Sequence, residues 1–151
     1  MIRVVVADDD LLVREGIQHL LESEPDIELA AVSSDRDGLM DAIERESPDV
    51  VLTDIRMPPH QSSEGLDVAQ QVRQAHPSIG VLVISHYLEP QYALALLEDG
   101  TAGRGYLLKD QLGNREQLVS AIEQVAAGGS VIDPQVIDAL VRTHQRDEES
   151  P

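Results

Sequence analysis

A chain of 151 residues is long enough to bury one hydrophobic core and too short for two ordinary domains, so we expect one domain with a short appendage. The formal net charge of −17 argues against nucleic-acid binding by this segment, because such binding draws most of its affinity from Lys and Arg contacts to phosphates. The absence of cysteine excludes disulfides and cysteine-ligated metal sites and fits a reducing compartment, so we expect a cytoplasmic location.

Short apolar runs alternate with stretches of helical periodicity along most of the chain. The runs are aliphatic or β-branched and carry few charges, which is typical of strands that are buried on both faces. They span residues 2–7, 27–32, 50–53, 81–84 and 105–108. The first run is too short for a signal peptide or a spanning helix, and no later one is long enough, so we expect no membrane association.

Between these runs, apolar residues recur at the spacing of one helix face. Proline precedes three of the strands and glycine follows two of the helical stretches, as expected at element boundaries. The boundary residues are Pro25, Pro48 and Pro77, and Gly100 and Gly128. The pattern predicts five strand–helix units, and hence an α/β fold with a parallel sheet, right-handed crossovers and helices on both faces.

A further amphipathic stretch opens at Asp133-Pro134, after a glycine-rich segment. We assign residues 1–128 to the domain, 129–145 to an extra helix or linker, and 146–151 to a disordered tail. The extra helix is expected either to fold back on the domain or to pair with a second copy of the chain as a homodimer contact. Folding back is favoured because the helix is short.

Side chains that can carry chemistry stand at the ends of four predicted strands. These are Asp8 and Asp9 after the first strand, Asp54 at the end of the third, Ser85 after the fourth and Lys109 after the fifth. Ligands of such sheets bind beyond the carboxyl ends of the strands, so these side chains are expected to converge at one edge. Asp10, which follows the acidic pair, is expected to cap the first helix.

Carboxylates that are brought together repel one another unless a cation lies among them. A hard divalent ion with oxygen ligands resolves the repulsion, and Mg²⁺ suits a site with few carboxylates, some waters and a phosphate oxygen. The set then supplies the parts of phosphoryl transfer, with Asp54 as the oxygen nucleophile, Lys109 as a point charge and the Ser85 hydroxyl as a donor. Taken singly, such residues more often cap helices or lie in solvent, so the prediction depends on the four strand ends together.

The same residues resemble the receiver domains of two-component response regulators. The matching pieces are Ala7-Asp8-Asp9, Asp54-Ile55-Arg56-Met57-Pro58, the strand that ends in Ser85, and residues 105–110. The resemblance covers roughly residues 1–128 and implies a doubly wound, flavodoxin-like sheet of five parallel strands in the order 2-1-3-4-5. Residues 105–110 and 13–16 are most similar to the NarL/FixJ (LuxR-type) branch.

The resemblance also implies a role for each residue of the site. Asp54 is implied to be the phosphoacceptor, and Asp8, Asp9, Asp54 and the backbone carbonyl of Arg56 to bind Mg²⁺. Lys109 is implied to contact the phosphate, Ser85 to be the switch hydroxyl, and Tyr106 to be the aromatic residue whose rotamer follows phosphorylation. The chain would then be a regulatory phosphoacceptor and not an enzyme, with a sensor histidine kinase as its partner.

Members of this branch usually carry a C-terminal helix-turn-helix domain, which would bind DNA and control transcription. The chain stops at Pro151, so we expect either a shortened form of such a regulator or a stand-alone receiver. The loop over residues 59–64 is longer than the family usually shows. Arg56 and Tyr87, two positions after Asp54 and Ser85, are expected to flank the path of a hydrolytic water.

Other functions are less compatible with the sequence. A phosphatase of the haloacid dehalogenase kind needs a second acid two residues after its nucleophile, where this chain has Arg56. A dinucleotide-binding domain needs a glycine-rich loop where Asp8, Asp9 and Asp10 stand. The histidines show no metal-ligand spacing, although the position of His86 beside Ser85 leaves room for it close to the phosphate. The main alternative is a receiver-like interaction module that signals without phosphorylation.

Overall fold

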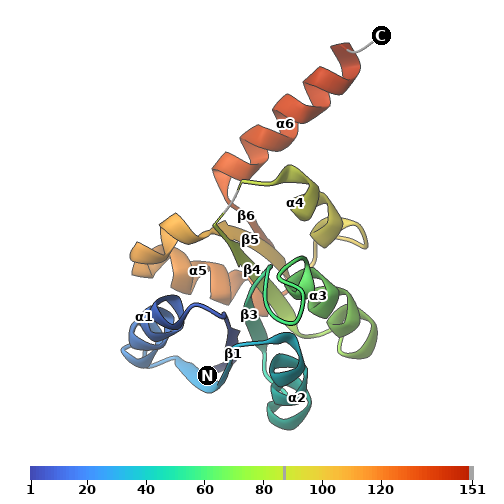
Figure 1. Cartoon of the computed structure of the whole chain (residues 1–151). Helices are drawn as coiled ribbons and strands as arrows, with labels where there is room; N and C mark the ends of the chain where they lie inside the picture. Colours follow the sequence, from blue (N-terminus) through green and yellow to red (C-terminus); the bar gives the residue numbers. More distant parts are fainter. Residues whose placement is uncertain (87, 150–151) are drawn as a thin grey trace.

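The computed structural model describes residues 1–86 and 88–149, which form one six-stranded parallel sheet with helices on both faces (Figure 1). The strands are β1 Ile2–Ala7, β2 Ile27–Ser33, β3 Val50–Asp54, β4 Gly80–Ser85, β5 Arg104–Leu108 and β6 Ser130–Ile132. The helices are α1 Leu11–Glu22, α2 Arg36–Glu46, α3 Glu64–Ala75, α4 Pro90–Leu97, α5 Arg115–Ala126 and α6 Pro134–Glu149, with a 3-10 helix over Lys109–Gly113.

The strand order is β2-β1-β3-β4-β5-β6, so the five predicted strands and their order are confirmed. The sequence prediction missed β6, which pairs in parallel with β5 from Arg104 to Tyr106. Only Val131 and Ile132 of β6 are apolar, which is too short a run to predict a strand from periodicity. The strand forms because the edge of β5 offers unpaired backbone groups, a tertiary effect.

The core consists of two apolar layers, one on each face of the sheet. Helices α1 and α5 cover one face and α2, α3 and α4 cover the other (Figure 1). Successive strand residues alternate between the layers, with Val5 and Val51 in one and Val4 and Val50 in the other. Full burial of each such side chain contributes roughly 1.5–3 kcal/mol. The rigid sheet therefore holds its strand ends in fixed positions.

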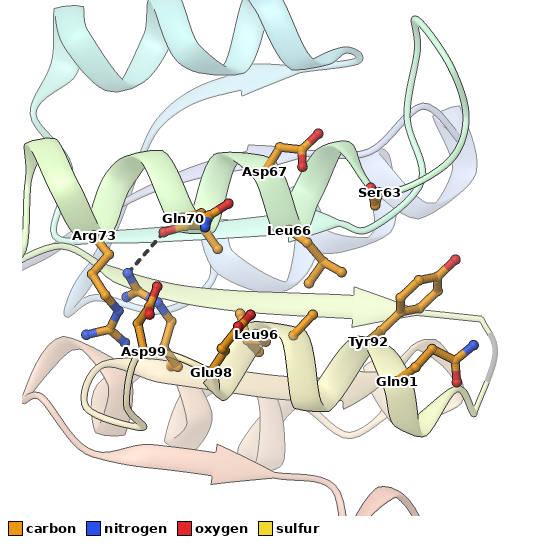
Figure 2. A pocket seen from close by; sticks show the side chains of 13 residues that line it. Ser63, Leu66, Asp67, Gln70, Arg73, Gln91, Tyr92, Leu96, Glu98 and Asp99 are labelled. Atoms are coloured by element: carbon orange, nitrogen blue, oxygen red, sulfur yellow. Dashed lines mark hydrogen bonds between the residues drawn. The ribbon is translucent and has the colours of Figure 1, made fainter.

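A cleft of about 360 Å³ lies between α3 and α4, lined by Arg73 of α3 and Leu96 of α4 (Figure 2). The buried guanidinium of Arg104, also in this cleft, donates to the carbonyl oxygens of Ala69 and Ile79 at 3.2 Å each. Burial and the nearby charge of Arg73 lower the pKa of Arg104 to about 10. Arg104 thus links α3 and the residue before β4 to the start of β5.

The extra helix α6 begins at Pro134, directly after Asp133, whose Oδ1 accepts a hydrogen bond from Gln135 N at 2.9 Å. Val136 in its first turn is fully buried, whereas Ile137 and Val141 are about half exposed and the helix extends away from the body (Figure 1). Leu140 in the second turn also packs against the core, so the helix folds back on the domain over its first two turns. Residues 146–149, expected within a disordered tail, are helical, and 150–151 lie outside the described residues.

Across the described chain, no helix combines the length and apolarity that a bilayer span requires.

Candidate functional site

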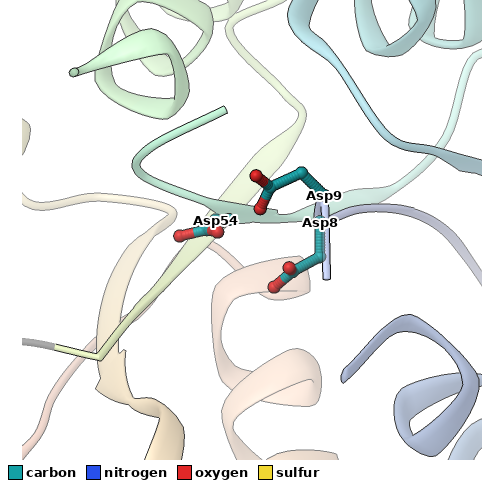
Figure 3. Close-up of side chains that lie close together, drawn as sticks. All are labelled: Asp8, Asp9 and Asp54. Atoms are coloured by element: carbon teal, nitrogen blue, oxygen red, sulfur yellow. The ribbon is translucent and has the colours of Figure 1, made fainter. Parts of the chain in front are cut away.

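The side chains predicted to converge do so at the carboxyl edge of the sheet. Carboxylate oxygens of Asp8, Asp9 and Asp54 lie within 4.8 Å of one another (Figure 3). Asp54 ends β3 in the middle of the sheet and is only 6% exposed, and Asp8 is fully buried, while Asp9 faces solvent. Asp9 and Asp54 border a cavity of about 430 Å³ that is also lined by Ser85 and Lys109. Four strands thus contribute to one polar site.

Lys109 joins two of the carboxylates. Its Nζ lies 2.8 Å from Asp8 Oδ2 and 3.0 Å from Asp54 Oδ2. It is the only lysine among the 11 Lys and Arg residues of the chain, and it is 8% exposed. An ammonium group at this place offsets part of the repulsion between Asp8 and Asp54, which otherwise lie together in a poorly solvated site.

Burial and the charges of neighbouring groups together shift the pKa values of Asp54 and Lys109. Burial, and then the charge of Asp8, raise the pKa of Asp54, while Lys109 works in the other direction. For Lys109, burial lowers the pKa, but the Asp8 and Asp54 carboxylates outweigh it and raise the pKa above its ordinary value. Lys109 therefore keeps its charge at neutral pH, and the Asp54 carboxylate is held in an environment that disfavours its ionised form.

The raised pKa of Asp54 predicts a pH-dependent effect of Asp54→Asn on stability. A carboxyl whose pKa is higher in the folded than in the unfolded chain stabilises the fold below the unfolded pKa, about 3.9, and this contribution is lost as the pH rises through the folded pKa. Without divalent cations, Asp54→Asn is therefore expected to raise the melting temperature at pH 7 and to lose this advantage near pH 4. Thermal unfolding of both proteins across this range checks the prediction, and an advantage independent of pH would contradict it.

The acidic cluster fits a hard divalent cation. Asp8 Oδ2 is buried and accepts no hydrogen bond of good geometry within the described chain, although it is ion-paired with Lys109. Asp8 Oδ1 accepts a hydrogen bond from Asp10 N at 2.8 Å, which orients the carboxylate. Oxygen ligands from few carboxylates, with one of them open to water, are the donor set that Mg²⁺ prefers. Asp10 also caps α1, as predicted, by accepting from Leu12 N at 2.9 Å.

Arg56 follows Asp54 in the turn after β3. Its amide donates a long hydrogen bond of 3.4 Å to Asp54 Oδ1, and its guanidinium forms an ion pair with Glu89 and donates to the Tyr92 hydroxyl. Arg56 also lines the cavity. Tyr87, its expected counterpart, lies outside the described residues.

Ser85 and Tyr106 connect the site to the neighbouring core. Both are buried, and Tyr106 packs in the layer that contains α4. Burial raises the pKa of the Tyr106 phenol, and a hydrogen bond with Ser85 acts against this rise. The ring of Tyr106 is thus already turned inward, with its hydroxyl near the side chain that borders the cavity. His86 lines the same cavity.

The sequence prediction missed two residues, one in the loop between β3 and α3 and one at the start of α3. Gln61 lines the cavity and its Nε2 donates to Asp9 Oδ2 at 2.7 Å. Glu64, the first residue of α3, is 2% exposed and accepts hydrogen bonds from the loop backbone. An acid in the first turn of a helix is a weak sequence signal for such a role, and Gln61 carried no signal.

The comparisons with known proteins agree with this geometry. A family model described as the response regulator receiver domain matches residues 4–123. The chain therefore belongs to the receiver domain family of two-component response regulators.

Its relatives are regulators of the branch expected from the sequence. The chain is 34% identical over 145 residues to the transcriptional regulatory protein DegU of Brevibacillus brevis, covering 96% of this chain and 58% of that protein. It is 34% identical over 139 residues to the probable transcriptional regulatory protein NarL of Mycobacterium tuberculosis, covering 92% and 61%. The chain thus spans about three fifths of the length of these curated relatives.

Solved structures show the same fold. The receiver domain of the putative response regulator NarL from Mycobacterium tuberculosis is 35% identical, with a TM-score of 0.74, and the match covers 84% of this chain and 97% of that one. The response regulator ChrA, from a heme-sensing two-component system, is 32% identical, with a TM-score of 0.73, and the match covers 94% and 65%.

Proposed function

We propose that residues 1–128 form a phosphoacceptor receiver that takes a phosphoryl group from a sensor histidine kinase on Asp54, with Mg²⁺, in the cytoplasm. The observation that supports this most directly is the buried Asp54 carboxylate, which borders an open cavity and is flanked by Asp8 and by Lys109 at 3.0 Å. A nucleophile, a cation-binding pair and a fixed ammonium group together match the requirements of phosphoryl transfer.

In the proposed step, a carboxylate oxygen of Asp54 attacks the phosphorus of the kinase phosphohistidine. A P–O bond forms while the P–N bond breaks, and the leaving imidazole nitrogen keeps the bonding electron pair. The Lys109 ammonium and the Ser85 hydroxyl are placed to donate hydrogen bonds to the phosphoryl oxygens as charge develops on them. The product is an acyl phosphate on Asp54, so the chain is a regulatory phosphoacceptor and not an enzyme with a separate substrate.

Asp8, Asp9, Asp54 and the backbone carbonyl of Arg56 would hold the Mg²⁺ ion. Mg²⁺ supplies positive charge that neutralises the carboxylates and the phosphoryl oxygens. Asp8 then has two roles: it holds Lys109 through the 2.8 Å ion pair, and it offers its remaining capacity to the cation.

An apolar groove of about 810 Å³ adjoins the site and suits a helix of the kinase. Its lining includes Leu12 and Gly16 of α1, Leu112, and also His86 and Lys109 of the cavity described above. Leu12 and Leu88 of this lining are 79% and 45% exposed, and exposed apolar side chains that lie together in one groove indicate a protein–protein interaction site. A helix seated in this groove would bring its phosphohistidine next to Asp54.

The phosphoryl group adds roughly −1.5 to −2 charges and would draw in the Ser85 hydroxyl, with Tyr106 packed behind it. This favours one of two pre-existing conformations of the face formed by α4, β5 and α5. We propose that the output is transcription, controlled through a helix-turn-helix domain that binds DNA, because DegU and NarL are named as transcriptional regulators. This acidic segment would not contact DNA itself. The exposed Ile137 and Val141 of α6 would provide a contact for a second copy of the chain.

Intact-mass measurement after treatment with a small phosphodonor and Mg²⁺ tests the proposal. One added phosphate is expected on the wild-type chain and none on Asp54→Asn, because the amide is not a nucleophile for this transfer. Asp41→Asn, a matched change on α2 outside the site, is expected to take up phosphate normally. The absence of any adduct, together with no measurable Mg²⁺ binding, would instead favour a receiver-like interaction module that signals without phosphorylation.

A further inference from the structure

We propose that Gln61 is a positioning residue of the cation site, which orients the Asp9 carboxylate from a loop that Glu64 holds in place. The inference rests on the proposed function and deepens it, because it identifies what fixes the exposed member of the acidic pair. It concerns residues 57–64, the connection between β3 and α3, which closes over one side of the cavity.

Gln61 is held in a defined conformation. Its backbone has a φ of 52°, in the left-handed region that a residue with a side chain rarely adopts. Its backbone N–H donates to Met57 O at 2.9 Å. This turn directs the carboxamide to Asp9, where Nε2 donates to Oδ2 at 2.7 Å. A strained backbone that serves one side-chain contact at a polar site suggests that the contact has a function.

Glu64 fixes the loop that carries Gln61. Its carboxylate, 2% exposed, accepts from His60 N at 2.7 Å and from Ser62 N at 2.8 Å, the residues on either side of Gln61. Burial acts to raise the pKa of Glu64, but these backbone donors outweigh it and lower the pKa, so the group stays ionised at neutral pH. The loop is therefore attached to the first turn of α3.

The first turn of α3 is itself hydrogen-bonded to the residue that follows β3, the strand that ends in Asp54. Gly65 N donates to Ile55 O at 2.8 Å, directly after Asp54. One continuous set of contacts thus runs from the β3 end through Glu64 and Gln61 to Asp9. Because Asp9 is exposed and its carboxylate would otherwise rotate in solvent, a fixed donor on Oδ2 leaves its other oxygen in one orientation. Such outer contacts typically change metal affinity about 10- to 100-fold.

Calorimetric titration of the full chain with Mg²⁺ tests the inference. Gln61→Ala is expected to weaken Mg²⁺ binding about ten-fold without a change in melting temperature, because Gln61 is exposed and packs in no core. Gln74→Ala, the same change on α3 away from the site, is the matched control and is expected to bind as the wild type.

Glu64→Gln provides a second test of the inference, through the residue that holds the loop. It should weaken Mg²⁺ binding to a similar degree and speed hydrogen exchange at the amides of His60 and Ser62, which lose an ionised acceptor. The double variant should bind Mg²⁺ no more weakly than either single variant, because both act through the same contact. If the wild-type chain binds Mg²⁺ and accepts phosphate, and Gln61→Ala binds Mg²⁺ with the same affinity as the wild type, the inference is overturned and the proposed function stays intact. A wild-type chain that does neither would overturn the proposed function itself.

Discussion

Lys109→Met is expected to slow phosphoryl uptake by Asp54 about 10²- to 10³-fold, the loss that follows removal of one fixed donor from a transition state. Methionine keeps the unbranched apolar stem and removes only the ammonium group, which lies 3.0 Å from Asp54 and 2.8 Å from Asp8. The rate is measured from the time course of intact mass with a small phosphodonor and saturating Mg²⁺.

The same substitution separates a structural role from an electrostatic one. Without the ammonium group, Asp8 and Asp54 face each other without a cation, so the melting temperature should fall when Mg²⁺ is absent and recover when it is added. Arg115→Met, which removes an exposed cation 4.0 Å from Glu24, is the control and is expected to change neither quantity. Wild-type uptake by Lys109→Met would show that Lys109 has no part in the transfer.

Gly65→Ala is expected to destabilise the fold by about 3 kcal/mol or more, because added volume at a tightly packed site costs this much when the neighbours cannot move. A Cβ at this position would lie 2.1 Å from Asp54 O and 2.9 Å from Ile55 Cα, which are backbone atoms of the last residue of β3 and of the residue after it. For a domain of this size the melting temperature should fall by about 6–12 °C. Calorimetry measures the shift.

Gly16→Ala provides the matched control for this substitution. Gly16 is also helical, but a Cβ there meets nothing within 4 Å. The change should stabilise α1 by about 0.5–1 kcal/mol through helix propensity and the lower entropy of the unfolded chain. Equal effects of the two substitutions would contradict the close approach of α3 to the backbone at the end of β3.

Local patterns in the sequence were sufficient to predict most of the fold. Each run expected to be a strand is one. The signal is clearest for β3 and β4, because they are buried at every residue and are therefore apolar along most of their length. The convergence of Asp8, Asp54 and Lys109 followed from the same logic, since parallel strands bring their carboxyl ends to one edge.

The tertiary structure decided what local patterns do not encode. Strand β6 exists because the edge of β5 was available for pairing, and the contact between Gln61 and Asp9 joins residues 52 positions apart. The burial of Glu64 and the ion pairs that Lys109 shares between two carboxylates likewise depend on distances between separate elements. A sequence shows which side chains reach the edge of the sheet, whereas only the packed fold determines which of them touch, because those contacts come from long-range packing and not from periodicity.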